Sequence, residues 1–202
     1  AASRQIVGNH HIILETDEPE GPHQMRVGLR RLRAILRAFE PLLDEAAQRL
    51  NRHCIAFGRS VGALRDADVL WHDISLPVKG TAFEADGYDE LEAILSSHRS
   101  EKRDEVRAML GGTEFRALQL ELALWPQALD ENRLLDTPIA DLASISLDRA
   151  WKRVEKRGRN VARLTISERH DLRKSVKNLR YAVECFASLY PERAVKPFIK
   201  RL

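Results

Sequence analysis

The chain of 202 residues contains little cysteine and no long apolar run. Its two cysteines, Cys54 and Cys185, do not have the spacing of a metal or redox site, which favours free thiols in a reducing compartment over a disulfide. No apolar stretch reaches the roughly 18 residues needed to span a bilayer, and the N-terminus lacks the apolar segment of a signal peptide. We therefore expect a soluble, cytoplasmic protein. The first residues, Ala-Ala-Ser, include no Met and predict a processed or excised chain.

Several catalytic patterns are also missing. The sequence has no nucleophile elbow, no glycine-rich phosphate loop and no pair of catalytic carboxylates. The histidines outside the repeated motif described below do not have the i, i+4 spacing of a metal site. They are His10, His11, His53, His72 and His98. We expect no catalytic residue, no metal and no cofactor, and an enzyme is the less supported class.

Strand-like alternation of polar and apolar residues is rare and helix-forming residues dominate, so we expect an all-α fold. Segment 77–87 contains a proline and two glycines without periodicity and predicts a linker, while Pro41 predicts a bend and Thr113 an N-cap. Helical spacing predicts helices over residues 3–16, 22–39, 44–64, 88–110, 113–127, 147–161 and 170–186, with a further short helix at Pro138.

Two finer expectations concern the first half of the chain. In the predicted helix 3–16, we expect Ile6, Ile13 and Val7 to point inward. The acids of the segment Arg65-Asp66-Ala67-Asp68 either cap the next turn by accepting backbone N–H bonds or pair with basic groups of residues 23–39. The structural role as a cap is the favoured alternative.

Residues 23–39, HQMRVGLRRLRAILRAF, combine two stripes with the same helical stride. Residues at this spacing share one face of a helix, so the apolar stripe should be buried. It consists of Met25, Leu29, Leu32, Leu36 and Phe39. About 100° further round the helix lies a basic stripe, with no acidic residue in the whole segment. We call it the first basic ridge; it consists of His23, Arg26, Arg30, Arg33 and Arg37, with Arg31 beside it.

The pattern recurs at residues 170–186, HDLRKSVKNLRYAVECF, at an offset of 147 residues from His23 to His170. The second basic ridge consists of His170, Arg173, Lys177 and Arg180, with Lys174 beside it, and these four match His23, Arg26, Arg30 and Arg33. The apolar stripe recurs as Leu172, Val176, Leu179, Val183 and Phe186. Any two amphipathic helices can share an apolar stripe by chance, but a shared pattern of basic residues beside it is much rarer. We therefore infer two structural repeats related by an approximate twofold axis, with the ridges facing each other.

The two copies are not identical. Arg37 of the first ridge is matched by Glu184, so the ridges are unequal at that end. The counterpart of residues 65–68 would lie beyond Leu202. We therefore expect a second half that is shorter or truncated at its C-terminus.

A third basic stripe lies in the predicted helix 147–161 and is opposed only by Glu155. It consists of Arg149, Lys152, Lys156, Arg159 and Arg163, thickened by Arg153 and Arg157. A solvated face would predict compensating acids at i+4, as in residues 88–110, and the basic stripes largely lack them. The net charge is only +3, so the distribution of charge matters more than its total.

The basic stripes predict the kind of ligand. Arginine's planar fork binds phosphate, so the stripes predict an extended, phosphate-rich ligand. His23 and His170 either add charge beside such a ligand or brace the helix starts.

The repeated His-x-x-Arg helices, with RRLRA in one and KNLRYA in the other, together with GALRDADV at 62–69, resemble the CHAD family, the conserved histidine α-helical domain. The resemblance covers essentially the whole chain. It implies a single domain over residues 1–202, with a first helical half at about 1–135 and a second at about 136–202. The implied fold has two four-helix-bundle-like halves, approximate twofold symmetry and a central basic cavity that binds inorganic polyphosphate. The implied binding residues are His23, Arg26, Arg30, Arg33, His170, Arg173, Lys177 and Arg180, with Arg31, Arg37 and Lys174 as second-rank candidates.

The resemblance implies a non-catalytic binding module, alone or attached to a phosphohydrolase such as a CYTH triphosphatase domain. It also implies a cytoplasmic location that includes polyphosphate granules, and no membrane partner. Two alternatives stay open: nucleic-acid (RNA) binding, and a helical scaffold for an acidic protein partner. Base readout usually places aromatic or amide side chains among the basic residues. Only Tyr181 and Asn178 do so here, so RNA ranks below polyphosphate.

Overall fold

The computed structural model describes residues 2–40, 43, 45–80, 87–125 and 137–202. Throughout these residues the secondary structure is helical and contains no strand, which confirms the expected all-α fold. The chain divides into two compact units. Unit 1 comprises Ala1–Leu32 and Ala46–Gln127, and unit 2 comprises Arg33–Glu45 and Ala128–Leu202. None of the helices in the described ranges has both the length and the apolar character that crossing a bilayer requires.

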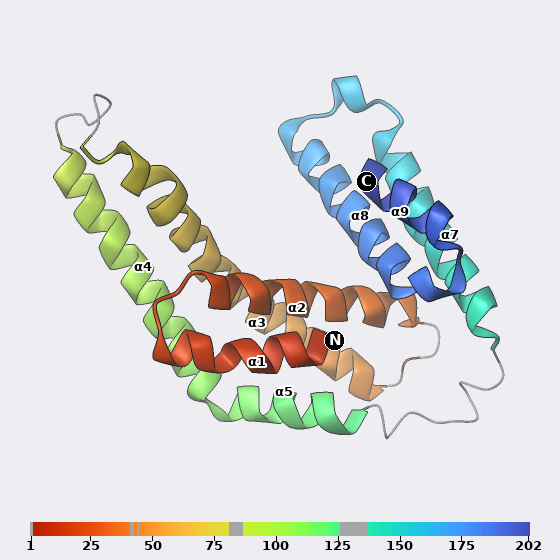
Figure 1. Cartoon of the computed structure of the whole chain (residues 1–202), viewed down its shortest axis with the longest axis horizontal. Helices are drawn as coiled ribbons and strands as arrows, with labels where there is room; N and C mark the ends of the chain where they lie inside the picture. Colours follow the sequence, from red (N-terminus) through yellow and green to blue (C-terminus); the bar gives the residue numbers. More distant parts are fainter. Residues whose placement is uncertain (1, 41–42, 44, 81–86, 126–136) are drawn as a thin grey trace. The chain divides into compact units, whose positions relative to one another are not determined.

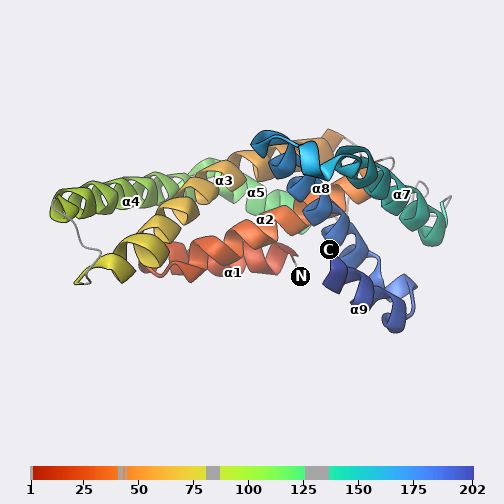
Figure 2. The same ribbon diagram turned by 90° about the horizontal axis from the view of Figure 1, so that it is seen from above.

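Unit 1 contains α1 (Ala2–Glu15), most of α2 (Glu20–Ala38), α3 (Glu45–Val69), α4 (Tyr88–Gly111) and α5 (Thr113–Leu124). A π-helical turn, Leu70–Ser75, and a 3-10 turn, Leu76–Val78, follow α3. Within the unit, α1 and α2 lie side by side (Figures 1 and 2), and Phe115 of α5 stacks on His10 of α1 with ring centroids 4.8 Å apart. The sequence predicts these five helices to within a few residues at the ends that are described, except that α3 continues to Val69, past the predicted end at Leu64.

The apolar stripe of α2 is buried as its spacing predicts, with Met25, Leu29 and Leu36 at most 1% exposed. Gly28 lets α1 approach α2 closely, because a Cβ atom there would lie 2.9 Å from Cγ1 of Ile6. Ile6 and Ile13 are fully buried. Val7 is 37% exposed, so the expectation that it points inward is wrong. Val7 lies about 100° round the helix from Ile6, which places it at the edge of the buried stripe.

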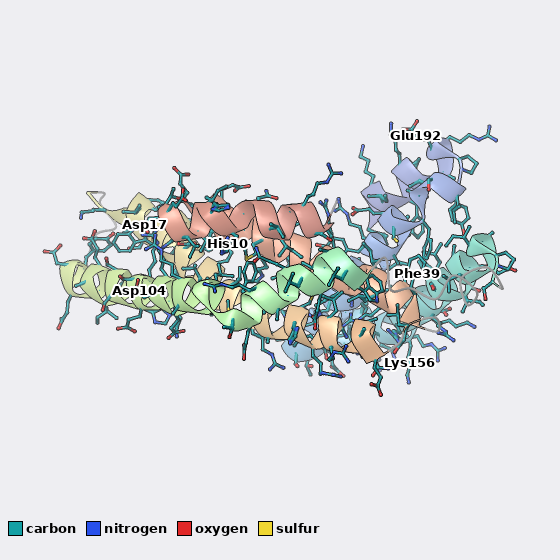
Figure 3. The ribbon with its side chains drawn as sticks, turned by 90° about the horizontal axis from the view of Figure 1, so that it is seen from below. His10, Asp17, Phe39, Asp104, Lys156 and Glu192 are labelled. Carbon is teal, nitrogen blue, oxygen red and sulfur yellow. The ribbon has the colours of Figure 1, made fainter. Side chains whose placement is uncertain are left out.

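Helix α4 is attached to the end of α1 by three arginines. Arg103 and Arg107 donate to the backbone oxygen of Thr16, and Arg99 donates to that of Asp17. The last carbonyl groups of a helix have no partners within the helix, and Arg107 satisfies one of those of α1 by donating from Nε to the backbone oxygen of Ile13 at 3.1 Å. Asp17 also forms ion pairs with Arg103 and Arg107, and Figure 3 shows it beside α4.

The acids of residues 65–68 do not cap a new turn, so the favoured expectation is wrong and its alternative holds in part. Helix α3 continues through them to Val69, so there is no helix start for them to cap. Asp66 instead pairs with Arg26 of the first basic ridge at 2.9 Å. Asp68 is fully buried, and its Oδ1 accepts bonds from Arg99 Nε at 2.8 Å and Arg103 Nη2 at 2.9 Å.

The remaining local expectations are partly outside the described residues, and those for Thr113 and Pro138 need correction. The predicted break at residues 77–87 lies between α3 and α4, inside unit 1, and its residues 81–86 are outside the described residues, as is Pro41. Thr113 is the first residue of α5, and Gly112 occupies the N-cap position without a side-chain cap. The short helix at Pro138 and the helix predicted at 147–161 form one continuous helix, because nothing between Ile139 and Gly158 interrupts the hydrogen-bond ladder.

Unit 2 contains the end of α2, then α7 (Ile139–Gly158), α8 (Ile166–Cys185) and α9 (Glu192–Arg201), with 3-10 turns at Val161–Arg163 and Ala187–Leu189. Helices α7 and α8 form a closely packed antiparallel pair (Figure 1). A capping box starts α8: the side chain of Thr165 accepts from Glu168 N, while Glu168 accepts from Thr165 N at 2.8 Å.

A small core joins the end of α2 to α7 and α8. Ala38, Ala143 and Phe186 are buried there, with Phe39, Leu147 and Cys185 packed against them. The buried hydroxyl of Ser146 on α7 donates to the backbone oxygen of Ala38. This bond satisfies a carbonyl at the C-terminal end of α2. The end of the first basic ridge therefore lies against α7 and α8 within one compact unit.

Candidate anion-binding site

A basic groove lies between α7, α8 and the end of α2, with a volume of about 390 Å³. We call it the α7–α8 groove. Its lining residues are Arg37, Ala150, Arg153, Arg157, Asp171, Lys174, Ser175 and Asn178. A smaller depression of about 50 Å³ continues it along α7. It shares Arg37, Ala150, Arg153 and Asn178 with the groove, and its further charged residues are Arg149 and the acidic Glu40. Basic side chains from three helices therefore surround one surface depression.

The spacing of residues along α7 and α8 explains why the groove is basic. Arg149, Arg153 and Arg157 recur every four residues, so they form one stripe along α7 that extends for about 12 Å. On α8, Lys174 and Asn178 are likewise four residues apart. Ala150 lies on the groove side of α7, where its small side chain leaves space. The same stride that predicts the basic stripe thus directs it into the groove.

Positive charge in the groove is only partly compensated. Four basic side chains line the main depression, against the single carboxylate of Asp171. Asp171 pairs with Lys174 at 3.1 Å, and this hydrogen bond to the lysine holds the pKa of Asp171 below its usual range. Within the described part of the chain, Arg37 and Arg153 form no ion pair or hydrogen bond. The groove therefore presents guanidinium groups that can bind an anion.

Arg157 is held differently from the other basic residues. Its Nη1 donates to the backbone oxygen of Asp171 at 3.3 Å and to Oγ of Ser175. The Ser175 hydroxyl in turn donates to the backbone oxygen of Asp171 at 3.0 Å. These hydrogen-bond partners are neutral, so they orient Arg157 without a direct carboxylate contact, and the Asp171 carboxylate acts on its charge only through space.

Of the eleven residues that the sequence assigns to the site, Arg37 and Lys174 line the α7–α8 groove. Three others form local contacts. Arg26 donates to Gly62 O at 2.8 Å besides pairing with Asp66, and Arg180 pairs with Glu184 at 3.0 Å. Arg31 donates to the side chain of Gln5 at 3.1 Å. A carboxylate beside Arg26 or Arg180 competes with any bound anion for its guanidinium group.

The remaining assigned residues are not among those that line the groove. Arg30 is half-buried, and its Nε is buried without a partner among the described residues. His23, Arg33 and Lys177 are half-buried, while His170 and Arg173 are exposed. Their roles in ligand binding stay predictions.

Sequence reasoning placed Arg153 and Arg157 in a basic stripe but not in the site. The internal repeat comprises residues 23–39 and 170–186. It does not include α7, so it gives no information about that helix. The available signal was the spacing of Arg149, Arg153 and Arg157 at i, i+4 and i+8, with Glu155 as the only acid in the stripe. That spacing identifies a single helix face, but not what the face lies against.

A second cavity in unit 2, of about 350 Å³, is chemically different. Its lining residues are Leu147, Asp148, Trp151, Leu179, Val183, Tyr190, Ala194, Val195 and Phe198. Apart from Asp148 these side chains carry no charge, so this cavity does not suit a polyanion. No group of three or more His, Cys, Asp and Glu side chains in the described ranges is placed to hold a metal ion.

Comparison with known proteins identifies a relationship over the whole chain. A family model described as the CHAD domain matches residues 1–202. The solved structure described as the CHAD domain from the plant Ricinus communis is similar, with a TM-score of 0.82 and 29% sequence identity. That match covers 98% of this chain and 66% of the plant chain, so this chain spans about two thirds of the plant chain's length. A search of curated proteins finds no match.

Proposed function

Because this chain belongs to the CHAD domain family, we propose that it binds inorganic polyphosphate and does not hydrolyse it. The observation that carries the proposal is the surplus of positive charge in the α7–α8 groove, where three arginines and a lysine surround one carboxylate. Guanidinium groups bind phosphate oxygens through paired N–H donors, and a chain of phosphates can contact several of them at once.

The proposal includes a larger site formed by both basic ridges. Arg37 from the first ridge and Lys174 from beside the second already line one groove in unit 2, which supports a shared ligand. We also propose that the two repeats are related by an approximate twofold axis, with the ridges as walls of a central basic cavity. The contact between the equivalent residues Phe39 and Phe186 supports this symmetry, because a twofold axis brings equivalent positions together where it passes between them.

Binding titrations at several salt concentrations test the proposal. Each phosphate that a cation neutralises releases a condensed counterion, so affinity should fall steeply with salt. If all four basic groups of the groove bind phosphate, we expect a slope of log K against log salt of about −3, by analogy with single-stranded DNA. Absent or salt-insensitive binding of long-chain polyphosphate would contradict the proposal.

A charge-reversal pair localises the binding. Arg153→Glu introduces an acid into the groove and should weaken binding by more than tenfold. Arg193→Glu makes the same change on α9, where Arg193 is exposed and is not among the residues that line the groove, and should change affinity less than threefold. Equal losses in the two variants would indicate attraction by the protein's overall charge instead of a site.

Two further measurements separate the alternatives. Asn178 lines the groove and could contact a base edge, so RNA is the competitor to test. We expect polyphosphate to displace a labelled RNA oligonucleotide at lower concentration than RNA displaces polyphosphate. A scaffold for an acidic protein would bind neither. Release of phosphate from polyphosphate in the presence of magnesium would overturn the non-catalytic part of the proposal.

A further inference from the structure

We propose that Arg157 on α7 is the principal phosphate anchor of the α7–α8 groove and that Ser175 on α8 is its positioning residue. The inference deepens the proposed function and rests on it. Neither residue belongs to the two basic ridges of the repeated motif. The inference concerns which side chain contacts phosphate and what holds that side chain in place.

The hydrogen bonds of Arg157 leave its phosphate-binding edge open. Only Nη1 is used, and it donates to Asp171 O and Ser175 Oγ. In the described part of the chain, Nε and Nη2 have no hydrogen-bond partner. Nε and Nη2 form one edge of the guanidinium plane, and this edge can donate two parallel bonds to phosphate oxygens. The side chain is fixed through one nitrogen while a two-donor edge stays available.

The neighbouring cations lack this combination. Lys174 is engaged by the carboxylate of Asp171, and Arg180 by that of Glu184. A phosphate must compete with an acid for either of them. Arg37 and Arg153 have no such competitor but also nothing that orients them, so each loses rotamer freedom on binding. Arg157 is oriented in advance and has no hydrogen bond to a carboxylate, although the nearby Asp171 carboxylate interacts with its charge through space.

Ser175 orients Arg157 by accepting its N–H bond while donating its own proton to Asp171 O. Its side chain is buried, at 4% exposure, so water does not readily replace the hydroxyl. A serine that donates to the carbonyl four residues earlier is common in helices and would by itself be structural. The hydrogen bond from Arg157 distinguishes Ser175 from a purely structural serine. Its effect on phosphate binding can be measured.

The central experiment compares Arg157→Gln with Arg159→Gln in a long-chain polyphosphate titration. Arg159 follows the last residue of the same helix and is exposed, and although it belongs to the third basic stripe it is not among the residues that line the groove. Charge-assisted hydrogen bonds are among the stronger polar contacts, so we expect about a tenfold or greater loss for Arg157→Gln. Arg159→Gln should stay within about twofold. Arg157→Lys keeps the charge but not the fork and should fall between them.

A double-mutant cycle tests the role of Ser175. Ser175→Ala should weaken binding about threefold in the wild-type background, and should have no further effect in Arg157→Gln. Thermal unfolding of each variant shows whether the fold is retained. An equal effect of Ser175→Ala in both backgrounds would overturn the positioning role, and equal losses in Arg157→Gln and Arg159→Gln would overturn the anchor. Failure of the wild-type protein to bind polyphosphate would instead reject the proposed function itself.

Discussion

Phe39 and Phe186 occupy equivalent positions in the two copies of the repeated motif, and their ring centroids lie 5.6 Å apart with the planes inclined by 36°. Both belong to the small core of unit 2. The contact therefore connects the last residue of the first repeated segment to the last residue of the second. It also holds Arg37, two residues before Phe39, close to the helices that line the α7–α8 groove.

Removing the Phe186 ring should destabilise unit 2. Phe186 is 2% exposed, so Phe186→Ala leaves a cavity and should cost about 3–5 kcal/mol of unfolding free energy. Phe198→Ala is the matched control, because Phe198 is 37% exposed on α9 and should cost about 1 kcal/mol. Chemical denaturation measures both changes. Similar losses would show that the core around Phe186 does not hold the unit together.

Arg103 should matter for stability and not for anion binding. It is 2% exposed and its guanidinium contacts the buried Asp68, while burial lowers the pKa of Arg103. Arg103→Met removes one of the two arginines that compensate this carboxylate and should cost about 3–5 kcal/mol. Arg107→Met, at a more exposed position that contacts backbone oxygens and Asp17, should cost about 1 kcal/mol. Denaturant unfolding measures the loss of unfolding free energy in both variants. A smaller loss for Arg103→Met than for Arg107→Met would contradict the prediction.

The start of α8 should weaken in acid. Hydrogen bonds from the backbone and side chain of Thr165 hold the pKa of Glu168 below its usual range. The unfolded chain, with a pKa of about 4.3 for this carboxyl, binds a proton first as the pH falls. The ionised Glu168 therefore contributes fully to the free energy of unfolding above about pH 4.3. This contribution is lost as the pH falls through the lower pKa of Glu168 in the folded protein.

The measurement compares the wild type with Glu168→Gln by denaturant unfolding at pH 7 and pH 3. The wild type should be the more stable at pH 7, and the difference should shrink at pH 3. Circular dichroism follows the helix content in the same samples. A difference that stays constant with pH would show that the ionised form of Glu168 contributes nothing.

Neutralising Asp171 should strengthen polyphosphate binding. Its carboxylate pairs with Lys174 in the groove, and both side chains are about half exposed. Asp171→Asn frees Lys174 and removes a negative charge from the site, for an expected gain of about two- to fivefold in affinity. Glu192→Gln is the matched control. Glu192 pairs with Lys196 on α9, where Figure 3 shows it at the exposed start of the helix. An equal gain in the two variants would attribute the effect to net charge.

Much of the fold follows from helical periodicity, which is a local property. The stride of Met25, Leu29 and Leu36 predicts both a helix and its buried face, and the structure confirms both. Boundaries are harder to predict. The predicted break between the short helix at Pro138 and the helix from Leu147 is wrong, because Leu142, Ala143 and Ser146 are buried and continue the packed face of α7 across it.

The sequence by itself determined the all-α class, the internal repeat and an excess of arginine and lysine without local acidic partners. Tertiary structure decided which of these charges are compensated. Arg26 forms an ion pair with Asp66, forty residues away, whereas the hydrogen bonds of Arg157 go only to neutral oxygens of Asp171 and Ser175. A long charged side chain pairs with whatever the fold brings within about 4 Å of it. Spacing along a helix indicates the face on which a charge lies, but only packing determines its partner.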